Sequence, residues 1–151
     1  MAFDISQARQ PGLIRRLVAM LYDAVLLFAI LALAVALLVI PYAELLGSPF
    51  PNEDPIHRFV LQAYLLLVSG VFFTFFWING GQTLGMRAWR LRVLRDDGEP
   101  LSWRDAWLRF VTAILSLVPF GLGFLWILID PERLAWHDRL SRTRLVMASK
   151  S

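Results

Sequence analysis

Cysteine is absent from this 151-residue chain, and charged residues are scarce. The lack of cysteine excludes disulfides, thiolate metal sites, iron–sulfur clusters and cysteine nucleophiles. Charged residues make up 18% of the chain, against about 25% in soluble domains, and hydrophobic residues reach 58%, against about 45–50%. This balance excludes an ordinary soluble protein and favours a membrane protein, and the length allows one domain, residues 1–151.

Signatures of catalysis and of cofactor binding are missing as well. The chain has no H-E-x-x-H motif, no glycine-rich phosphate loop and no nucleophile with a base at a useful spacing. We therefore expect no enzyme activity, no cofactor and no metal centre. Glu53, Asp54 and His57 are the one acidic and histidine set with metal-ligand chemistry, but they lie in a proline-rich loop that is typically solvated.

Three apolar segments dominate the sequence, at residues 17–40, 59–78 and 110–129. The first has 24 residues with one charge, Asp23, and as a helix it is about 36 Å long, enough to cross a bilayer core of about 30 Å. The other two have 20 residues each and no charge. The first two segments predict full transmembrane helices.

The third segment carries helix breakers at its centre: Pro119, Gly121 and Gly123. Proline removes a helix hydrogen bond and clashes with the preceding turn. A broken helix at membrane depth is tolerated only where protein or a water-filled cavity satisfies its backbone. The segment is therefore predicted as a broken element, either a re-entrant hairpin or a full crossing.

Basic residues are distributed unevenly around these segments. The loop 41–58 has three acidic residues and a single arginine, Arg58, at its far edge, whereas the loop 79–109 holds six arginines. The other basic groups precede the first segment (Arg9, Arg15, Arg16) or follow the third (Arg133, Arg139, Arg142, Arg144, Lys150). The positive-inside rule predicts a cytoplasmic N-terminus. It favours the hairpin for the third segment, because a full crossing leaves the basic tail outside.

A further variant lays residues 103–118 along the interface between the bilayer and water. Anionic lipid headgroups are the expected partners of the basic groups, rather than nucleic acid.

A small β-structure is expected on the cytoplasmic side, within about residues 87–104. Residues 89–95 alternate between apolar and basic, and Asp96, Asp97 and Gly98 follow. Such alternation before Asp-Gly is typical of a β-hairpin. Residues 144–147 could add a strand, which gives a ribbon of two or three strands. The predicted fold is an all-α membrane protein with this hairpin attached.

Several motifs resemble the RDD family of bacterial membrane proteins, over roughly residues 10–147. The family is named for one arginine and two aspartates, and its arginine at the start of the first membrane helix precedes the first aspartate by seven residues, as Arg16 precedes Asp23. The likeness continues in Gly81-Gln-Thr-Leu-Gly-Met86, where the family typically has a basic residue directly after G-Q-T-L-G, and in Trp136-His-Asp-Arg-Leu-Ser-Arg-Thr143. We match the second aspartate to Asp138, with Asp130 as the rival.

The resemblance implies a multi-pass protein of the bacterial cytoplasmic membrane. Transport of an unspecified ligand has been suggested for the family, and some members are described as sodium/proton antiporters. It therefore implies transport of a small ion or solute, with cation/proton exchange as one form. The alternative is a non-catalytic membrane subunit or scaffold that assembles with itself or with a partner protein. Transport predicts a homo-oligomer, because a chain with so few crossings hardly encloses a path.

Asp23 is the first candidate site residue, since an ionisable group in a membrane helix is functional by default. It shares a helix face with Arg16, two turns away. In the functional interpretation, Asp23 exchanges a proton for an alkali cation. In the structural one, an arginine holds Asp23 in an ion pair, with Arg109 or Arg87 as the expected cation.

Asp130, His137 and Asp138 form the second candidate group, just beyond the third segment. Histidine titrates near neutral pH, so these residues are candidates for a proton-entry site or a pH sensor. The plainer interpretation is helix capping and surface pairing with Arg133, Arg139 and Arg142.

Overall fold

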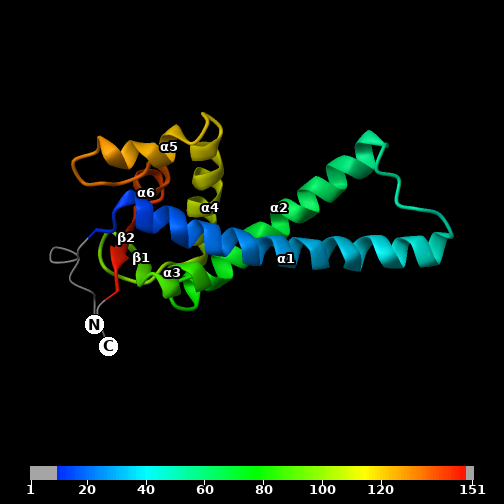
Figure 1. Cartoon of the computed structure of the whole chain (residues 1–151), viewed down its shortest axis with the longest axis horizontal. Helices are drawn as coiled ribbons and strands as arrows, with labels where there is room; N and C mark the ends of the chain where they lie inside the picture. Colours follow the sequence, from blue (N-terminus) through cyan, green and yellow to red (C-terminus); the bar gives the residue numbers. More distant parts are fainter. Residues whose placement is uncertain (1–9, 149–151) are drawn as a thin grey trace. The chain divides into compact units, whose positions relative to one another are not determined.

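The computed structural model describes residues 10–148 (Figure 1). Arg9 and Lys150, two of the basic residues used to predict the orientation in the membrane, lie outside the described residues. The chain forms two compact units. One is the segment Ala24–Phe72, and the other combines the residues up to Asp23 with those from Phe73 onward.

Two long helices confirm the first two predicted apolar helices. Helix α1 covers Leu13–Leu46 and helix α2 covers Pro55–Ile78, and both are long and apolar enough to cross a membrane. With 34 and 24 residues, they are about 51 and 36 Å long. Both begin before the predicted segments, because hydropathy marks only the apolar part of a helix and not its polar ends.

The loop before α2 starts that helix through a side-chain cap. Asp54 Oδ1 accepts the backbone N–H of Ile56 at 2.7 Å, and Asp54 lies 3.5 Å from the His57 ring nitrogen. The ring of Phe50 packs edge-on against Tyr42 and His57, with centroids 5.0 and 5.8 Å apart. Among residues 10–148, no group of three histidine or acidic side chains is placed to hold a metal ion.

Helix α4, Trp103–Leu117, has its polar face turned inward. Arg109, Thr112 and Ser116 are buried, whereas Leu108, Val111 and other large apolar side chains are exposed. In water this arrangement would be unfavourable, because burying charge and exposing apolar surface both cost free energy. It is the arrangement expected of a helix that faces lipid.

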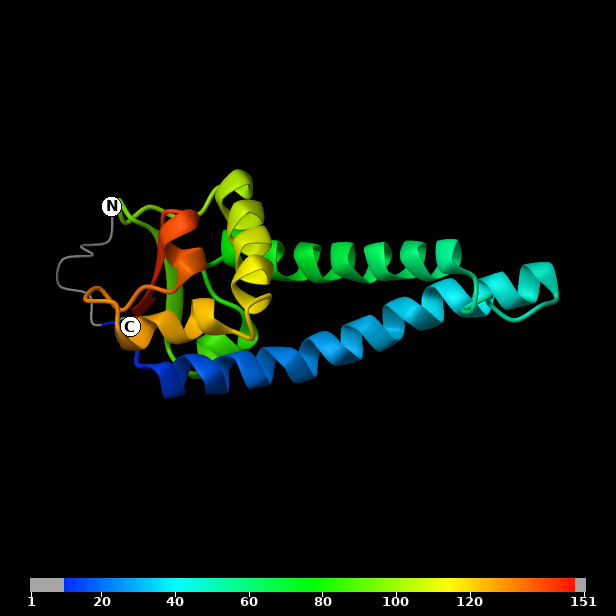
Figure 2. The same cartoon turned by 90° about the horizontal axis from the view of Figure 1, so that it is seen from above.

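The third apolar segment is broken where the sequence predicts it. Helix α4 is followed by α5, Leu122–Leu125, and by the 3-10 turn η2, Trp126–Leu128, and the two parts meet at a bend of 106° (Figure 2). Gly123 allows the corner to close, since a Cβ there would lie 2.6 Å from the Ser116 Cβ. Such a bent pair is either a broken span or a re-entrant loop.

The predicted two-stranded ribbon is present, but its strands are not joined by the predicted turn. Strand β1, Leu91–Arg95, pairs antiparallel with β2, Thr143–Met147, from Leu91 opposite Met147 to Arg95 opposite Thr143. Gly98 does close a turn onto the Arg95 carbonyl, at 3.0 Å. No strand follows that turn, because the later segment, expected only as an addition, takes the partner position.

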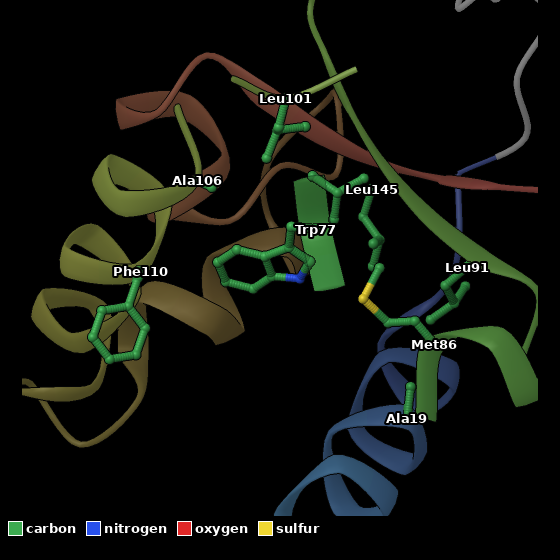
Figure 3. Close-up of a cluster of buried hydrophobic side chains, with 9 residues drawn as sticks. Ala19, Trp77, Met86, Leu91, Leu101, Ala106, Phe110 and Leu145 are labelled. Carbon is green, nitrogen blue, oxygen red and sulfur yellow. The ribbon is translucent and has the colours of Figure 1, made fainter. Parts of the chain in front are cut away.

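Two short helices, α3 at Leu84–Ala88 and α6 at Trp136–Leu140, complete the second unit. Its buried apolar side chains come from most of the elements: Ala19, Trp77, Met86, Leu91, Val93, Leu101, Ala106, Phe110 and Leu145 (Figure 3). This core fixes the first turns of α1 and the last turns of α2 against the sheet and α4. Of the candidate site residues, Arg16, Asp23 and Arg109 project from α1 and α4, whereas His137 and Asp138 lie on α6 and Asp130 lies in the loop before it.

Candidate functional site: a buried ion-pair cluster and an isolated aspartate

Asp138, in the first turn of α6, is the centre of a buried charge cluster. Its side chain is fully buried and lies between two guanidinium groups, with Arg16 Nη1 at 2.8 Å from Oδ2 and Arg109 Nη1 at 2.7 Å from Oδ1. Oδ2 also accepts the backbone N–H of Ala135 at 3.0 Å, which caps α6. One carboxylate thus joins α1, α4 and α6.

Arg16 lies near the start of α1 and is almost fully buried. Besides Asp138, it donates to the backbone carbonyls of Arg133, at 2.9 Å, and Pro11, at 3.4 Å. The guanidinium group therefore binds both the chain that leads into α1 and the loop that precedes α6. A lysine in this position would offer a single point charge and would not reproduce the set of hydrogen bonds that the planar guanidinium group donates in several directions.

Arg109, in the middle of α4, holds the opposite side of the cluster. Its Nη1 donates to the Thr143 hydroxyl at 2.5 Å, and its guanidinium carbon lies 5.4 Å from the Trp77 ring centroid. A cation over an indole face is attracted by the ring quadrupole. Arg109 thus connects α4 to the end of α2 and to β2.

The two arginines keep Asp138 ionised. Burial alone raises the pKa of its carboxyl, but the charges of Arg109, His137 and Arg16 and the Ala135 N–H outweigh this effect and hold the pKa well below its usual range. A carboxylate paired in this way carries protons poorly. The cluster is therefore built for fixed structure and not for proton exchange.

His137 is buried beside the cluster, and its ring lies 4.6 Å from that of Phe124. Burial, together with the charges of Arg109 and Arg16, lowers the pKa of His137 to about 4, against the opposing effect of Asp138. The prediction that His137 titrates near neutral pH is therefore wrong. The sequence could not reveal the loss of hydration that keeps this imidazole uncharged.

Asp23 lies apart from this cluster, in α1, and is 4% exposed. Its carboxylate accepts the Thr83 hydroxyl and, at 2.8 Å, the backbone N–H of Gly85, at the start of α3. Among the described residues, no cation lies within ion-pair distance of it. The expectation that Arg109 or Arg87 pairs with Asp23 is wrong, because Arg109 is bound to Asp138 and Arg87 is exposed.

Asp130 belongs to neither group. It lies 2.5 Å from Arg139 and accepts the Leu134 N–H at 2.9 Å, and these two contacts hold the pKa of its carboxyl below the usual range. The rival match for the second aspartate of the family is therefore a local cap. Of the predicted set, the structure brings together Arg16, Arg109, His137 and Asp138, and separates Asp23 and Asp130 from them.

A cavity of about 220 Å³ lies between α1 and α4, with Asp23, Arg16, Arg109 and His137 among its lining residues. Aromatic side chains from α2 and α4 supply much of the remaining wall: Phe73, Trp77 and Phe110. All the lining residues belong to one of the two compact units. The cavity therefore brings the isolated carboxylate and the charge cluster to a common space.

Sequence reasoning missed three residues of this region: Trp77, Thr83 and Thr143. Thr83 has a local signal, because a threonine directly before a helix commonly caps it, and its hydroxyl does accept the Met86 N–H at 3.2 Å. Thr143 ends the Trp136–Thr143 motif, but that motif does not reveal its contact with Arg109. Trp77 has no signal, since its contact with Arg109 depends on packing between distant segments.

The RDD family matches residues 10–142 of this chain. Comparisons with curated proteins and with solved structures found no match. The matched range includes the two long helices, the bent pair and the complete Arg16–Arg109–Asp138 cluster. The chain therefore belongs to the RDD family.

Proposed function

We propose that this RDD family protein moves a small ion or solute across the bacterial cytoplasmic membrane, with Asp23 as the group that gains and loses a proton. One observation carries the proposal. Asp23 is a buried carboxyl in a membrane helix, it lines a cavity, and no described cation holds it ionised. Such a group is expensive to keep in a membrane and is functional by default. We propose no catalytic role and no cofactor.

The proposed topology has two crossings, α1 and α2, with both ends of the chain in the cytoplasm. The pairing of β1 with β2 supports it, because paired strands lie on the same side of the membrane and the chain between them must then return to that side. A re-entrant α4–α5 corner meets this condition and a full third crossing does not. The basic residues of the loop 79–109 and of the tail then face anionic headgroups.

Transport by so small a protein requires several copies. Two crossings do not enclose a path, and large apolar side chains of α1 such as Phe28, which is 75% exposed, leave room for a second copy as well as for lipid. The proposed assembly is a homo-oligomer. A protein that stays monomeric in detergent and in nanodiscs would contradict the transport proposal.

Flux in proteoliposomes tests the proposal directly. Purified protein is expected to move sodium, potassium or protons faster than empty liposomes, and Asp23→Asn, which preserves the shape but removes the titration, is expected to abolish this flux. Asp96→Asn, on an exposed carboxylate, is the matched control. Equal flux in the native protein and in Asp23→Asn would remove Asp23 from the mechanism.

The alternative function, a non-catalytic membrane subunit, is favoured by the closed geometry of the charge cluster. Asp138 and its two arginines are held by backbone and side-chain contacts that connect α1, α4 and α6, which is typical of a cluster that stabilises the fold. This alternative predicts that liposomes with the native protein move nothing and that a defined membrane partner co-purifies with it in stoichiometric amount.

A further inference from the structure

The cavity beside Asp23 has the size and lining of a site for a small amphiphilic molecule. Its volume of about 220 Å³ exceeds the roughly 150 Å³ of an apolar protein cavity that holds benzene. Leu17, Met20 and Leu117 line it and are also exposed on the apolar outer surface. The cavity is therefore accessible from the side that we propose faces lipid.

The Arg16–Arg109–Asp138 cluster at the cavity carries a net positive charge. Arg16 and Arg109 share a single carboxylate, Asp138, which leaves one positive charge buried at this end of the cavity. His137 is uncharged at neutral pH, since its pKa is about 4. Asp130 supplies no compensation, because it is paired with Arg139. A buried charge without a counter-charge is strongly unfavourable.

Asp23 is the acidic residue among those that line the cavity, and it lies seven residues along α1 from Arg16, about 10 Å along the helix axis. When Asp23 is ionised, the two positive charges of Arg16 and Arg109 are balanced by the two negative charges of Asp138 and Asp23. When Asp23 is protonated, the cavity carries one positive charge. Arg109 also has a buried Nε with no hydrogen-bond partner among the described residues, so a donor is available to an anion.

We propose that this cavity binds an amphiphilic monovalent anion, a monocarboxylate or lipid phosphate on an apolar body, and that binding is accompanied by protonation of Asp23. The anion replaces the negative charge that Asp23 gives up, and its apolar body contacts the aromatic wall. This inference concerns binding, so it holds whether or not the protein transports anything.

The groups that face Asp23 from the neighbouring elements are consistent with such a proton exchange. Helix α3 contributes the Thr83 hydroxyl and the Gly85 N–H, both of which are neutral donors. The lining residues of α2 carry no titratable group. The cationic groups on the cavity are Arg16 and Arg109, both of which bind Asp138, and neither forms an ion pair with Asp23.

Calorimetric titration of the full chain in detergent with benzoate tests the proposal. Binding is expected to take up about one proton per benzoate, measured from the heats in two buffers of different ionisation enthalpy. The dissociation constant is then expected to rise about tenfold for each pH unit above the pH at which Asp23 loses its proton in the empty protein. Benzamide, the neutral isostere, is expected to bind more weakly and without a pH dependence.

Asp23→Asn gives the sharpest outcome, because it leaves the cavity permanently positive. Benzoate is expected to bind this variant more tightly than the native protein at alkaline pH, with no proton uptake, and a misfolded protein would not gain affinity. Asp96→Asn, on an exposed carboxylate, is expected to behave as the native protein. Equal binding of benzamide and benzoate, or a pH dependence that survives in Asp23→Asn, would overturn the proposal.

Nanodiscs identify the source of the anion. If a lipid phosphate occupies the site, benzoate binds more weakly in phosphatidylglycerol than in phosphatidylcholine, and Asp23→Asn increases this difference. If free carboxylates occupy it, the affinity is the same in both lipids. Absence of benzoate binding in detergent and in both kinds of nanodisc would contradict the proposal even if the protein catalyses cation flux.

Discussion

At the scale of single residues, Asp138 decides whether two arginines can remain buried. Its carboxylate is the shared acceptor of Arg16 and Arg109, which come from helices far apart in the sequence. A buried ion pair often stabilises a fold no more than well-packed apolar residues would, but removal of one member leaves an uncompensated buried charge. The stability of the unit therefore depends on this one negative charge more than on any single contact around it.

Neutralisation of Asp138 should thus be costly. Asp138→Asn is expected to lower the free energy of unfolding by about 3–5 kcal/mol, because two buried guanidinium groups lose their counter-charge. Thermal or denaturant-induced unfolding in detergent measures the change. Asp96→Asn breaks the exposed pair with Arg144 and is expected to change the stability by less than about 1 kcal/mol. Equal effects of the two substitutions would contradict the assigned role.

His137 gives the protein a pH dependence of stability on the acid side. Its pKa falls from 6.5 to about 4 on folding, so between these values the unfolded chain binds a proton that the folded chain does not. Stability is expected to decrease as the pH falls through this window, by up to about 1.4 kcal/mol per pH unit. His137→Gln should flatten this slope, whereas His57→Gln should retain it. An unchanged slope in His137→Gln would show that the imidazole is hydrated.

At the scale of elements, the contact between α3 and α1 depends on a glycine. A Cβ at Gly85 would lie 2.9 Å from the Asp23 carboxyl carbon and would collide with the backbone carbonyl of Ala19. The short helix therefore approaches α1 closely enough for its N–H to bind Asp23. This close contact explains why the second glycine of the G-Q-T-L-G motif, Gly85, stands at this position.

Gly85→Ala is expected to lower the stability by about 1–3 kcal/mol, because backbone and not only side-chain atoms must move to accommodate the methyl group. Unfolding in detergent tests this, with Gly80→Ala as the control, since a Cβ at Gly80 meets nothing within 4 Å. Comparable stability of the two variants would mean that α3 shifts freely on α1.

The elements were more predictable from the sequence than the contacts between them. Long apolar runs and Pro119 identify the crossings and the break, because these signals are local. The ribbon was predicted with the wrong connection: the Asp97-Gly98 turn is present, but β1 pairs with the segment that was expected only as an added strand, Thr143–Met147. The cation for Asp23 was also predicted wrongly, because helix spacing shows which residues share a face and not what packs against that face.

At the scale of the whole molecule, we expect reporters fused before Met1 and after Ser151 to lie on the same side of the membrane. This expectation rests on the two proposed crossings and on the pairing of β1 with β2. Reporter activity in cells measures the location of each end, and a fusion within the loop 47–54 should report the opposite side. A C-terminal reporter on the outer side would refute the re-entrant corner.

The order of synthesis gives the Arg16–Asp138 pair a further consequence. The two residues are 122 positions apart, so at about 5–20 residues per second a ribosome makes the arginine roughly 6–24 s before the aspartate. During that interval the first helix exists without the carboxylate that pairs with its guanidinium group in the folded chain. A product that ends before residue 138 consequently lacks the carboxylate that pairs with Arg16 in the folded chain.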